Sequence, residues 1–128
     1  CEVNNEEELK EALSYAQEND LKIFILGKGS NILVSDKGFD GMVIKLGDKK
    51  YKIAGTKIEC NAGVLLSQIV NESAQNSLKG LEWAAGIPGT IGGAIRGNAG
   101  TAEGCMSENV ESVKAIRISR FPFLAENN

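Results

Sequence analysis

The stretch of residues 80–104, GLEWAAGIPGTIGGAIRGNAGTAEG, contains the residues best suited to bind a ligand. It holds eight of the fifteen glycines of the chain, separated by small and neutral polar side chains. Each glycine costs conformational entropy on folding, so this density indicates main chain that touches a ligand or adopts a positive φ. A flexible linker is the alternative, although apolar residues such as Trp83 and Ile91 are unusual in linkers. A collagen-like repeat is excluded, because the spacing of three that begins at Gly86 breaks down at once.

A second glycine-rich loop, Gly27-Lys28-Gly29-Ser30-Asn31, follows an apolar run. Main-chain N–H groups in successive turns form concave sites for anions, and glycine permits the torsions and the close approach that they need. Two such loops, at 27–31 and 86–100, therefore predict a site for a diphosphate. Side chains that could add donors or positive charge are Ser30, Thr90, Asn98, Lys28 and Arg96. Binding through many dipoles and few cations favours FAD over a nucleoside triphosphate, and no Gly-Lys-Ser/Thr phosphate loop occurs.

The composition narrows the class of protein. The chain has 128 residues, of which 42% are apolar and 24% charged, as in a globular domain with a modest core. A net charge of −3 without a basic face disfavours nucleic-acid binding, and no apolar run reaches membrane-spanning length. Three widely spaced cysteines and no histidine argue against structural zinc and against a histidine-assisted nucleophile. We therefore expect no metal, reduced thiols and a cytoplasmic location.

Hydrophobic periodicity predicts a mixture of helices and strands. An amphipathic helix is expected at 6–18, with Asn5 as its N-cap and Glu8 completing a capping box, and a second helix at 65–76. Strands or segments of β character are expected at 1–3, 22–26, 32–34, 42–46, 52–54, 57–61 and 110–118.

Two segments leave alternatives open. The order strand, loop, strand at 22–34 differs from the strand, loop, long helix of a Rossmann site, and a tight hairpin turn explains Gly27-x-Gly29 equally well. Residues 119–128, SRFPFLAENN, fit no element. They are either an apolar segment that docks on a groove or an arbitrary chain end, and we favour the second.

The two glycine-rich loops together carry a family resemblance. ILGKGSNILVSDKGFDGMVIKL, followed by GLEWAAGIPGTIGGAIRGNAGTAEG, resembles the UDP-N-acetylenolpyruvoylglucosamine reductases (UDP-N-acetylmuramate dehydrogenases) of bacterial cell-wall synthesis, over residues 1–118. The resemblance implies an α+β fold of the vanillyl-alcohol-oxidase or PCMH type, incomplete at both ends. It implies an FAD-binding domain at 1–118 made of two subdomains, about 1–47 and about 48–118, with FAD between them.

The resemblance also implies a set of cofactor-binding residues. Residues 27–32 would be the first diphosphate loop, 86–90 the second, 92–93 a close approach to the cofactor, and 98–100 the side facing the flavin. The residues so assigned are Gly27, Lys28, Gly29, Ser30, Asn31, Ile32, Gly86, Ile87, Gly89, Thr90, Gly92, Gly93, Asn98, Ala99 and Gly100. Trp83 is expected to be a core anchor, and no residue is assigned as catalytic or as a metal ligand.

In this family NADPH passes a hydride to FAD, and the flavin reduces the enolpyruvyl group of a UDP-sugar. The family's substrate domain, with its proton donor, is not found in this sequence. We therefore expect the FAD-binding portion of such a reductase, inactive by itself. The alternative is a free-standing flavin-binding module without reductase activity, and the sequence does not indicate an oligomeric state.

Overall fold

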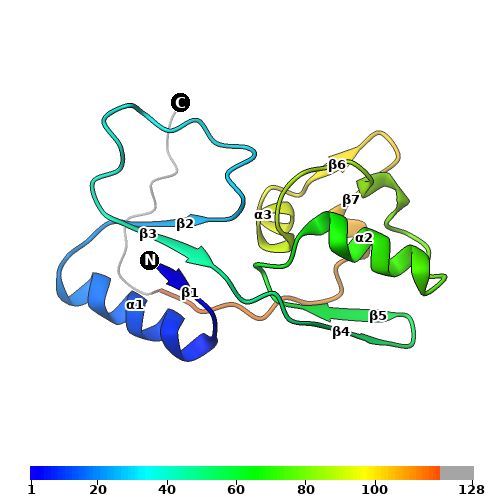
Figure 1. The fold of residues 1–128 in the computed structure, drawn as a ribbon, viewed down its shortest axis with the longest axis horizontal. Coiled ribbons are helices and arrows are strands. Elements are labelled where there is room, and N and C mark those ends of the chain that lie inside the picture. The colour runs from blue at the N-terminus through cyan, green and yellow to red at the C-terminus, as the bar shows by residue number, and fades with distance from the viewer. Residues whose placement is uncertain (119–128) are drawn as a thin grey trace.

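The computed structural model describes residues 1–118 and has two lobes, each built around its own core (Figure 1). We call residues 1–47 the first lobe, 48–109 the second lobe and 110–118 the linking segment. Every pair of helices or strands that packs closely, within the described residues, belongs to a single lobe. The predicted tail at 119–128 lies outside the described residues.

The first lobe is a short parallel sheet with one helix. Strands β1 (Glu2–Val3), β2 (Ile23–Leu26) and β3 (Met42–Leu46) lie in the order β1-β3-β2, and helix α1 (Glu6–Glu18) packs beside them. The helix begins where predicted, because the side chain of Asn5 accepts the Glu8 N–H at 2.8 Å and the Glu8 carboxylate accepts the Asn4 N–H at 2.8 Å. Leu13, Ala16, Val3 and Ile44 are buried in this lobe.

The second lobe combines short helices with two hairpins. Its elements are β4 (Tyr51–Ala54), β5 (Lys57–Cys60), α2 (Leu66–Gln75), the 3-10 turn η1 (Glu82–Ala84), α3 (Ile91–Arg96), β6 (Gly100–Thr101), β7 (Gly104–Cys105) and α4 (Met106–Asn109). The predicted hairpin around Gly55 and the second helix are confirmed. The core includes Trp83, as expected, and its indole N–H donates to Gly80 O and to Asn109 Oδ1, both at 2.9 Å.

Two predicted strands are wrong. Residues 32–34 form no strand, because β2 and β3 pair in parallel and residues 27–41 are the crossover between them. The same parallel pairing excludes the hairpin that we left open for Gly27-x-Gly29. Residues 110–118 form no strand either, since no described strand pairs with them, and Val113 and Ile116 stay exposed to solvent.

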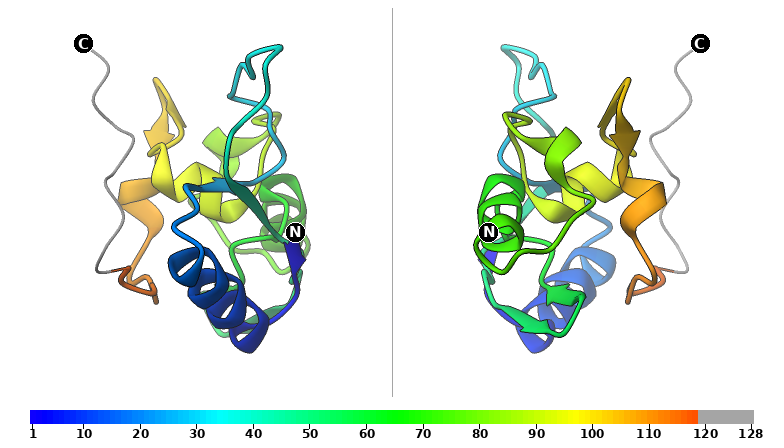
Figure 2. Two further views of the ribbon diagram at one scale, coloured as in Figure 1. Left: turned by 90° about the vertical axis from the view of Figure 1, so that its left-hand side faces the viewer. Right: turned by 90° about the vertical axis from the view of Figure 1, so that its right-hand side faces the viewer.

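Two projections rise from the same side of the molecule. The loop at 27–41 extends from the first lobe, and the β6–β7 hairpin extends in the same direction from the second (Figures 1 and 2). The linking segment runs from the second lobe back to the first (Figure 1). It is held at one end by an ion pair of Glu111 with Lys57 at 2.7 Å and further along by an ion pair of Lys114 with Glu6.

Three general expectations can be compared with the structure. Cys1, Cys60 and Cys105 are free thiols, and burial raises the pKa of the Cys60 thiol. Residues 1–118 contain no cluster of three or more acidic or cysteine side chains arranged to hold a metal ion. Over the same residues, no helix combines the length and the apolar character needed to cross a bilayer.

Candidate functional site

The two glycine-rich loops meet where the lobes face each other. The Ser30 hydroxyl, in the first lobe, donates to the Pro88 carbonyl of the second lobe at 3.2 Å. A Cβ placed on Gly27 would lie 2.7 Å from Thr90 Oγ1, so the main chain of the first loop runs directly against the Thr90 side chain. Segments about 60 residues apart in the sequence therefore form one continuous surface, as a shared diphosphate site requires.

The first loop presents unused main-chain donors. None of the N–H groups of residues 27–32 donates a hydrogen bond to another residue of the described chain. The loop bends at Gly29, whose φ of +77° lies in the left-handed region that glycine adopts without strain. Lys28, Ser30, Asn31 and Ile32 are exposed. A run of outward N–H groups in an open loop is the arrangement that holds an anion.

The second loop is hydrogen-bonded to residues 64–66, where α2 begins. Gly89 O accepts the Leu66 N–H at 3.1 Å, and the Ile91 N–H donates to Val64 O at 2.8 Å. Gly86 and Gly89 have φ values of +84° and +137°. The N–H groups of Gly86, Gly89 and Thr90 have no acceptor among residues 1–118, whereas Ile87 N–H is used within the turn by Ala84 O.

Gly92 and Gly93 serve the fold of α3. Gly92 N–H donates to Ala62 O at 2.9 Å, and a Cβ on Gly92 would lie 2.8 Å from the Ala62 methyl. Gly93 N–H donates to Thr90 Oγ1 at 3.3 Å, which caps the helix. The structure thus gives Gly92 a packing role that the sequence reasoning missed, and the predicted proximity of both glycines to a cofactor stays a prediction.

Residues 98–100 lie at the other end of α3. Asn98 Oδ1 accepts the Ser107 N–H at 2.9 Å, Ala99 O accepts the Met106 N–H at 3.0 Å, and Gly100 pairs with Cys105. No hydrogen bond within the described chain joins them to residues 27–32. They adjoin a hollow of about 320 Å³ lined by Ile95, Asn98, Met106, Ser107 and Val110. Within the described chain, contacts therefore join the first loop to residues 88–90, and no hydrogen bond joins it to residues 98–100.

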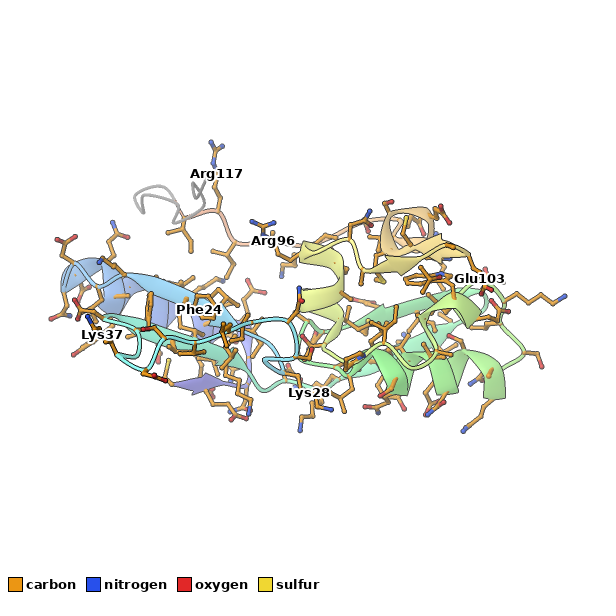
Figure 3. All side chains as sticks on the ribbon, turned by 90° about the horizontal axis from the view of Figure 1, so that it is seen from above. Phe24, Lys28, Lys37, Arg96, Glu103 and Arg117 are labelled. Atoms are coloured by element: carbon orange, nitrogen blue, oxygen red, sulfur yellow. The ribbon has the colours of Figure 1, made fainter. Side chains whose placement is uncertain are left out.

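The charges around the junction are few. Lys28 and Arg96 both lie near the middle of the molecule, close to where the two lobes meet (Figure 3). Both side chains belong to exposed residues. An anion at this junction would therefore be bound chiefly by main-chain dipoles, with at most these two cations nearby.

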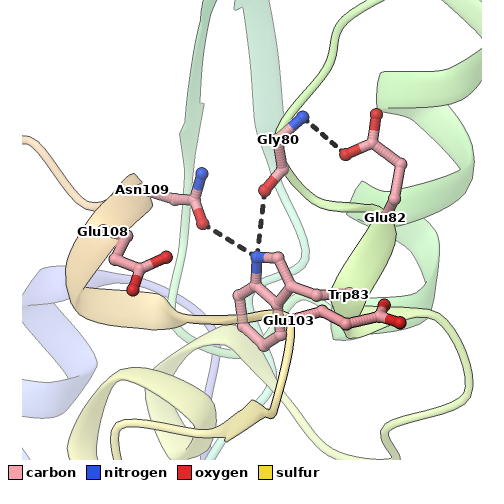
Figure 4. Close-up of a pocket in the computed structure, with 6 residues that line it drawn as sticks. All are labelled: Gly80, Glu82, Trp83, Glu103, Glu108 and Asn109. Atoms are coloured by element: carbon pink, nitrogen blue, oxygen red, sulfur yellow. Dashed lines mark hydrogen bonds between the residues drawn. The ribbon is translucent and has the colours of Figure 1, made fainter.

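A larger hollow, of about 470 Å³, lies elsewhere in the second lobe and was not predicted (Figure 4). It is lined by Gly80, Glu82, Trp83, Glu103, Glu108 and Asn109. The pKa of the Glu82 carboxyl is lowered first by a hydrogen bond from the main-chain N–H of Glu82 itself and then by one from the Gly80 N–H, at 2.7 Å. Three carboxylates repel phosphate, so this hollow is the wrong place for a diphosphate despite its size. Sequence reasoning missed it because the β6–β7 hairpin and α4 bring Glu103 and Glu108 beside Trp83.

Known proteins resemble this chain over most of its length. A UDP-N-acetylenolpyruvoylglucosamine reductase from Desulforamulus reducens is 43% identical over 115 residues, which are 88% of this chain and 38% of that protein. One from Clostridium tetani is 44% identical over 111 residues, 86% of this chain and 36% of that protein. The crystal structure of the Thermus caldophilus reductase matches with a TM-score of 0.70 and 40% identity, covering 83% of this chain and 37% of that one. The chain thus spans less than two-fifths of the length of these relatives.

The predicted resemblance and the predicted α+β class are confirmed by these matches. A family model described as "FAD binding domain" matches residues 1–118, the whole of the described chain. The chain therefore belongs to the family of FAD-binding domains.

Proposed function

We propose that this chain binds FAD at the junction of its lobes and is the FAD-binding part of a reductase. The reaction we propose for the whole protein is the NADPH-dependent reduction of UDP-N-acetylenolpyruvoylglucosamine to UDP-N-acetylmuramate, in the cytoplasm. The support for this reaction is the similarity to relatives that carry the reductase name. In these relatives, about three-fifths of the length lies outside the matched region.

One observation carries the FAD proposal. Two loops from different lobes touch through Ser30 and Pro88, and both carry main-chain N–H groups without a described acceptor. A diphosphate bridge offers several acceptor oxygens within a few ångströms, so it can accept from both loops at once. The main-chain N–H donors of both loops fit a diphosphate, and the small number of nearby cations fits a ligand that is bound chiefly by main-chain dipoles.

Bound FAD would carry hydride between NADPH and the substrate, and the protein would supply its position and environment. Residues 27–32 and 86–90 would hold the diphosphate. We keep 98–100 as the proposed flavin side, because they lie at the opposite end of α3 from Thr90, and a flavin ring stands well away from its diphosphate.

The FAD proposal is tested by titrating the flavin-free chain with FAD and following the quenching of flavin fluorescence. Gly86→Ala should weaken FAD binding by about tenfold or more, because alanine at a φ of +84° displaces the second loop. Gly55→Ala is the matched control, since its φ is +60° and both positions have open space around a new Cβ. Both variants should lose similar stability, and only the first should lose affinity. Failure of the unmodified chain to bind FAD would refute the proposal.

The free-standing flavin-binding module without reductase activity is the second candidate. The coding DNA beyond codon 128 separates the two. An in-frame continuation whose full product oxidises NADPH only when the UDP-sugar is present supports the reductase. A stop codon, together with a chain that binds FAD without such turnover, supports the module.

A further inference from the structure

The contact between the two glycine-rich loops has a structural role of its own. Among described residues, the lobes share no closely packed pair of helices or strands. They are joined covalently near residue 47, where the buried Gly63 lies against the Leu46 carbonyl, and at the other side by the exposed ion pairs of the linking segment. Exposed ion pairs contribute little to holding two bodies together.

We propose that Ser30 is a positioning residue that joins the two loops before FAD arrives. Its hydroxyl is donated to Pro88 O at 3.2 Å, so in this structure the proton is committed to the opposite lobe and not to a ligand. The proposal rests on the proposed FAD site and refines it, because it assigns Ser30 to assembly of the site.

The neighbouring contacts support this role. Gly27 lets the first loop approach Thr90 so closely that a methyl group there would lie 2.7 Å from Oγ1. Gly89, next to the Pro88 acceptor, would carry a Cβ only 3.5 Å from Ser30 Oγ. We call Gly27, Ser30, Pro88 and Thr90 the clasp. Its hydrogen bond is single and partly open to water, since Ser30 is exposed, so it biases the lobe arrangement without locking it.

A bias of this size has a measurable kinetic effect. A neutral hydrogen bond shifts an equilibrium between joined and separated loops by about two- to tenfold. The observed association rate and affinity for FAD scale with the fraction of molecules whose loops are already joined. Loss of the clasp should therefore slow FAD association by at most about tenfold, and by less the more the joined loops predominate in the unmodified chain. It should leave dissociation nearly unchanged, whereas loss of a direct ligand contact should speed dissociation.

The lobe arrangement can be measured without FAD. Trp83 is the only tryptophan and lies in the second lobe, and Cys1 is an exposed thiol in the first. Time-resolved energy transfer from Trp83 to an acceptor dye on Cys1 reports the distribution of distances between the lobes. Ser30→Ala should broaden this distribution in the flavin-free chain, and saturating FAD should narrow it again.

Two further variants sharpen the test. Ser30→Thr keeps the hydroxyl and should restore both the narrow distribution and the association rate. Gly27→Ala should reproduce the effect of Ser30→Ala by a different route, since its methyl pushes against Thr90. Ser35→Ala is the matched control, because that serine lies in the same loop and its hydroxyl accepts the nearby Lys37 N–H, with no bond to the second lobe among the described residues.

The outcomes are distinct. A narrow distribution and unchanged association in Ser30→Ala overturn the clasp, whether or not dissociation changes. Faster dissociation with unchanged association would show instead that Ser30 only contacts FAD. If the unmodified chain binds no FAD, the proposed function fails, and the energy-transfer comparison of Ser30→Ala, Ser30→Thr and Ser35→Ala still decides whether the clasp exists.

Discussion

Replacing Gly92 by alanine should destabilise the chain, although alanine is the better helix former. Gly92 lies in the first turn of α3, and its N–H donates to Ala62 O at 2.9 Å. A methyl group on it would lie 2.8 Å from the Ala62 methyl and 3.2 Å from the Ala62 carbonyl oxygen. Neither neighbour is a flexible side-chain end, so relief requires α3 to move away from residue 62.

The opposing contributions can be compared in size. Alanine gains about 1 kcal/mol over glycine in a helix interior. Overpacking of a close contact costs about 1–3 kcal/mol, and weakening the Gly92–Ala62 hydrogen bond costs about 1 kcal/mol more. The balance is a destabilisation of about 1–3 kcal/mol, which also moves Thr90 because it immediately precedes the helix.

The loss in the free energy of unfolding can be measured by urea unfolding followed by Trp83 fluorescence, because the only tryptophan is buried in the same core as Ile91. Gly93→Ala is the control in the same helix, because its new Cβ would meet only Thr90 Oγ1 at 3.4 Å. It should be neutral or stabilising by up to about 1 kcal/mol. Adding Ala62→Gly to Gly92→Ala removes the colliding methyl and should recover about 1–2 kcal/mol in a double-mutant cycle.

Equal stability of Gly92→Ala and Gly93→Ala would refute a steric clash with Ala62, and so would a failure of Ala62→Gly to rescue Gly92→Ala. Gly93→Ala also tests the predicted cofactor contact. A variant of full stability that binds FAD more weakly would place Gly93 against the cofactor.

Three further predictions concern the two lobes. Asn5→Ala removes the side-chain acceptor at the start of α1 and should cost about 1 kcal/mol in thermal or urea unfolding; no loss would refute the cap. The pKa of Glu6 is lowered to about 2 from 4.5, first by its hydrogen bond with Lys10 and then by that with Lys114. The stability that the ionised Glu6 carboxylate contributes is therefore present above pH 4.5 and lost as the pH falls towards 2. Glu6→Gln should remove this part of the pH dependence of unfolding. The difference between Glu6→Gln and the unmodified chain should shrink in high salt. Trp83→Phe leaves two acceptors without their donor and should cost about 1–3 kcal/mol by urea unfolding followed by circular dichroism; an unchanged midpoint would refute the importance of the indole N–H.

The elements that the sequence predicted well are those whose signals are local. Helix α1 runs over the predicted residues 6–18, because both the Asn5 cap and the apolar spacing lie within the helix itself. The β4–β5 hairpin follows from Gly55, whose φ of +60° makes the turn. In each case a few neighbouring residues determine the structure.

The predictions that failed depended on pairing over a distance. Residues 32–34 have β-forming side chains, but β2 and β3 pair in parallel, so these residues belong to the crossover between the two strands, and Leu33 is fully exposed at 101%. Residues 110–118 alternate in the manner of a strand, but no described strand pairs with them. β-Forming side chains favour a strand only when a neighbouring strand is available.

The convergence of the two loops was predicted from their chemistry, while the contacts that produce it were not. Ser30–Pro88 and Gly27–Thr90 join residues about 60 positions apart, and no local pattern encodes such a distance. The division of roles among the glycines could not be predicted for the same reason, because the sequence does not distinguish a glycine at a positive φ from a glycine packed against a methyl group.

That division gives the glycine-rich stretch two separate physical explanations. Gly86 combines a positive φ with open space and unused N–H, so its requirement comes from the shape of a loop that offers donors to a ligand. Gly104 has no such torsion, and a Cβ there would lie 2.7 Å from the Trp83 ring, so its requirement comes from packing of the core. FAD should separate the two kinds of substitution, because a ligand stabilises the folded state by an amount that grows with its affinity. Gly86→Ala, which weakens FAD binding, should gain less stability from FAD than the unmodified chain does. Gly104→Ala disturbs the core beneath the Trp83 indole and leaves the lobe junction unchanged, so it should gain as much from FAD as the unmodified chain. Stability measured with and without FAD therefore separates glycines that serve the site from glycines that serve the fold.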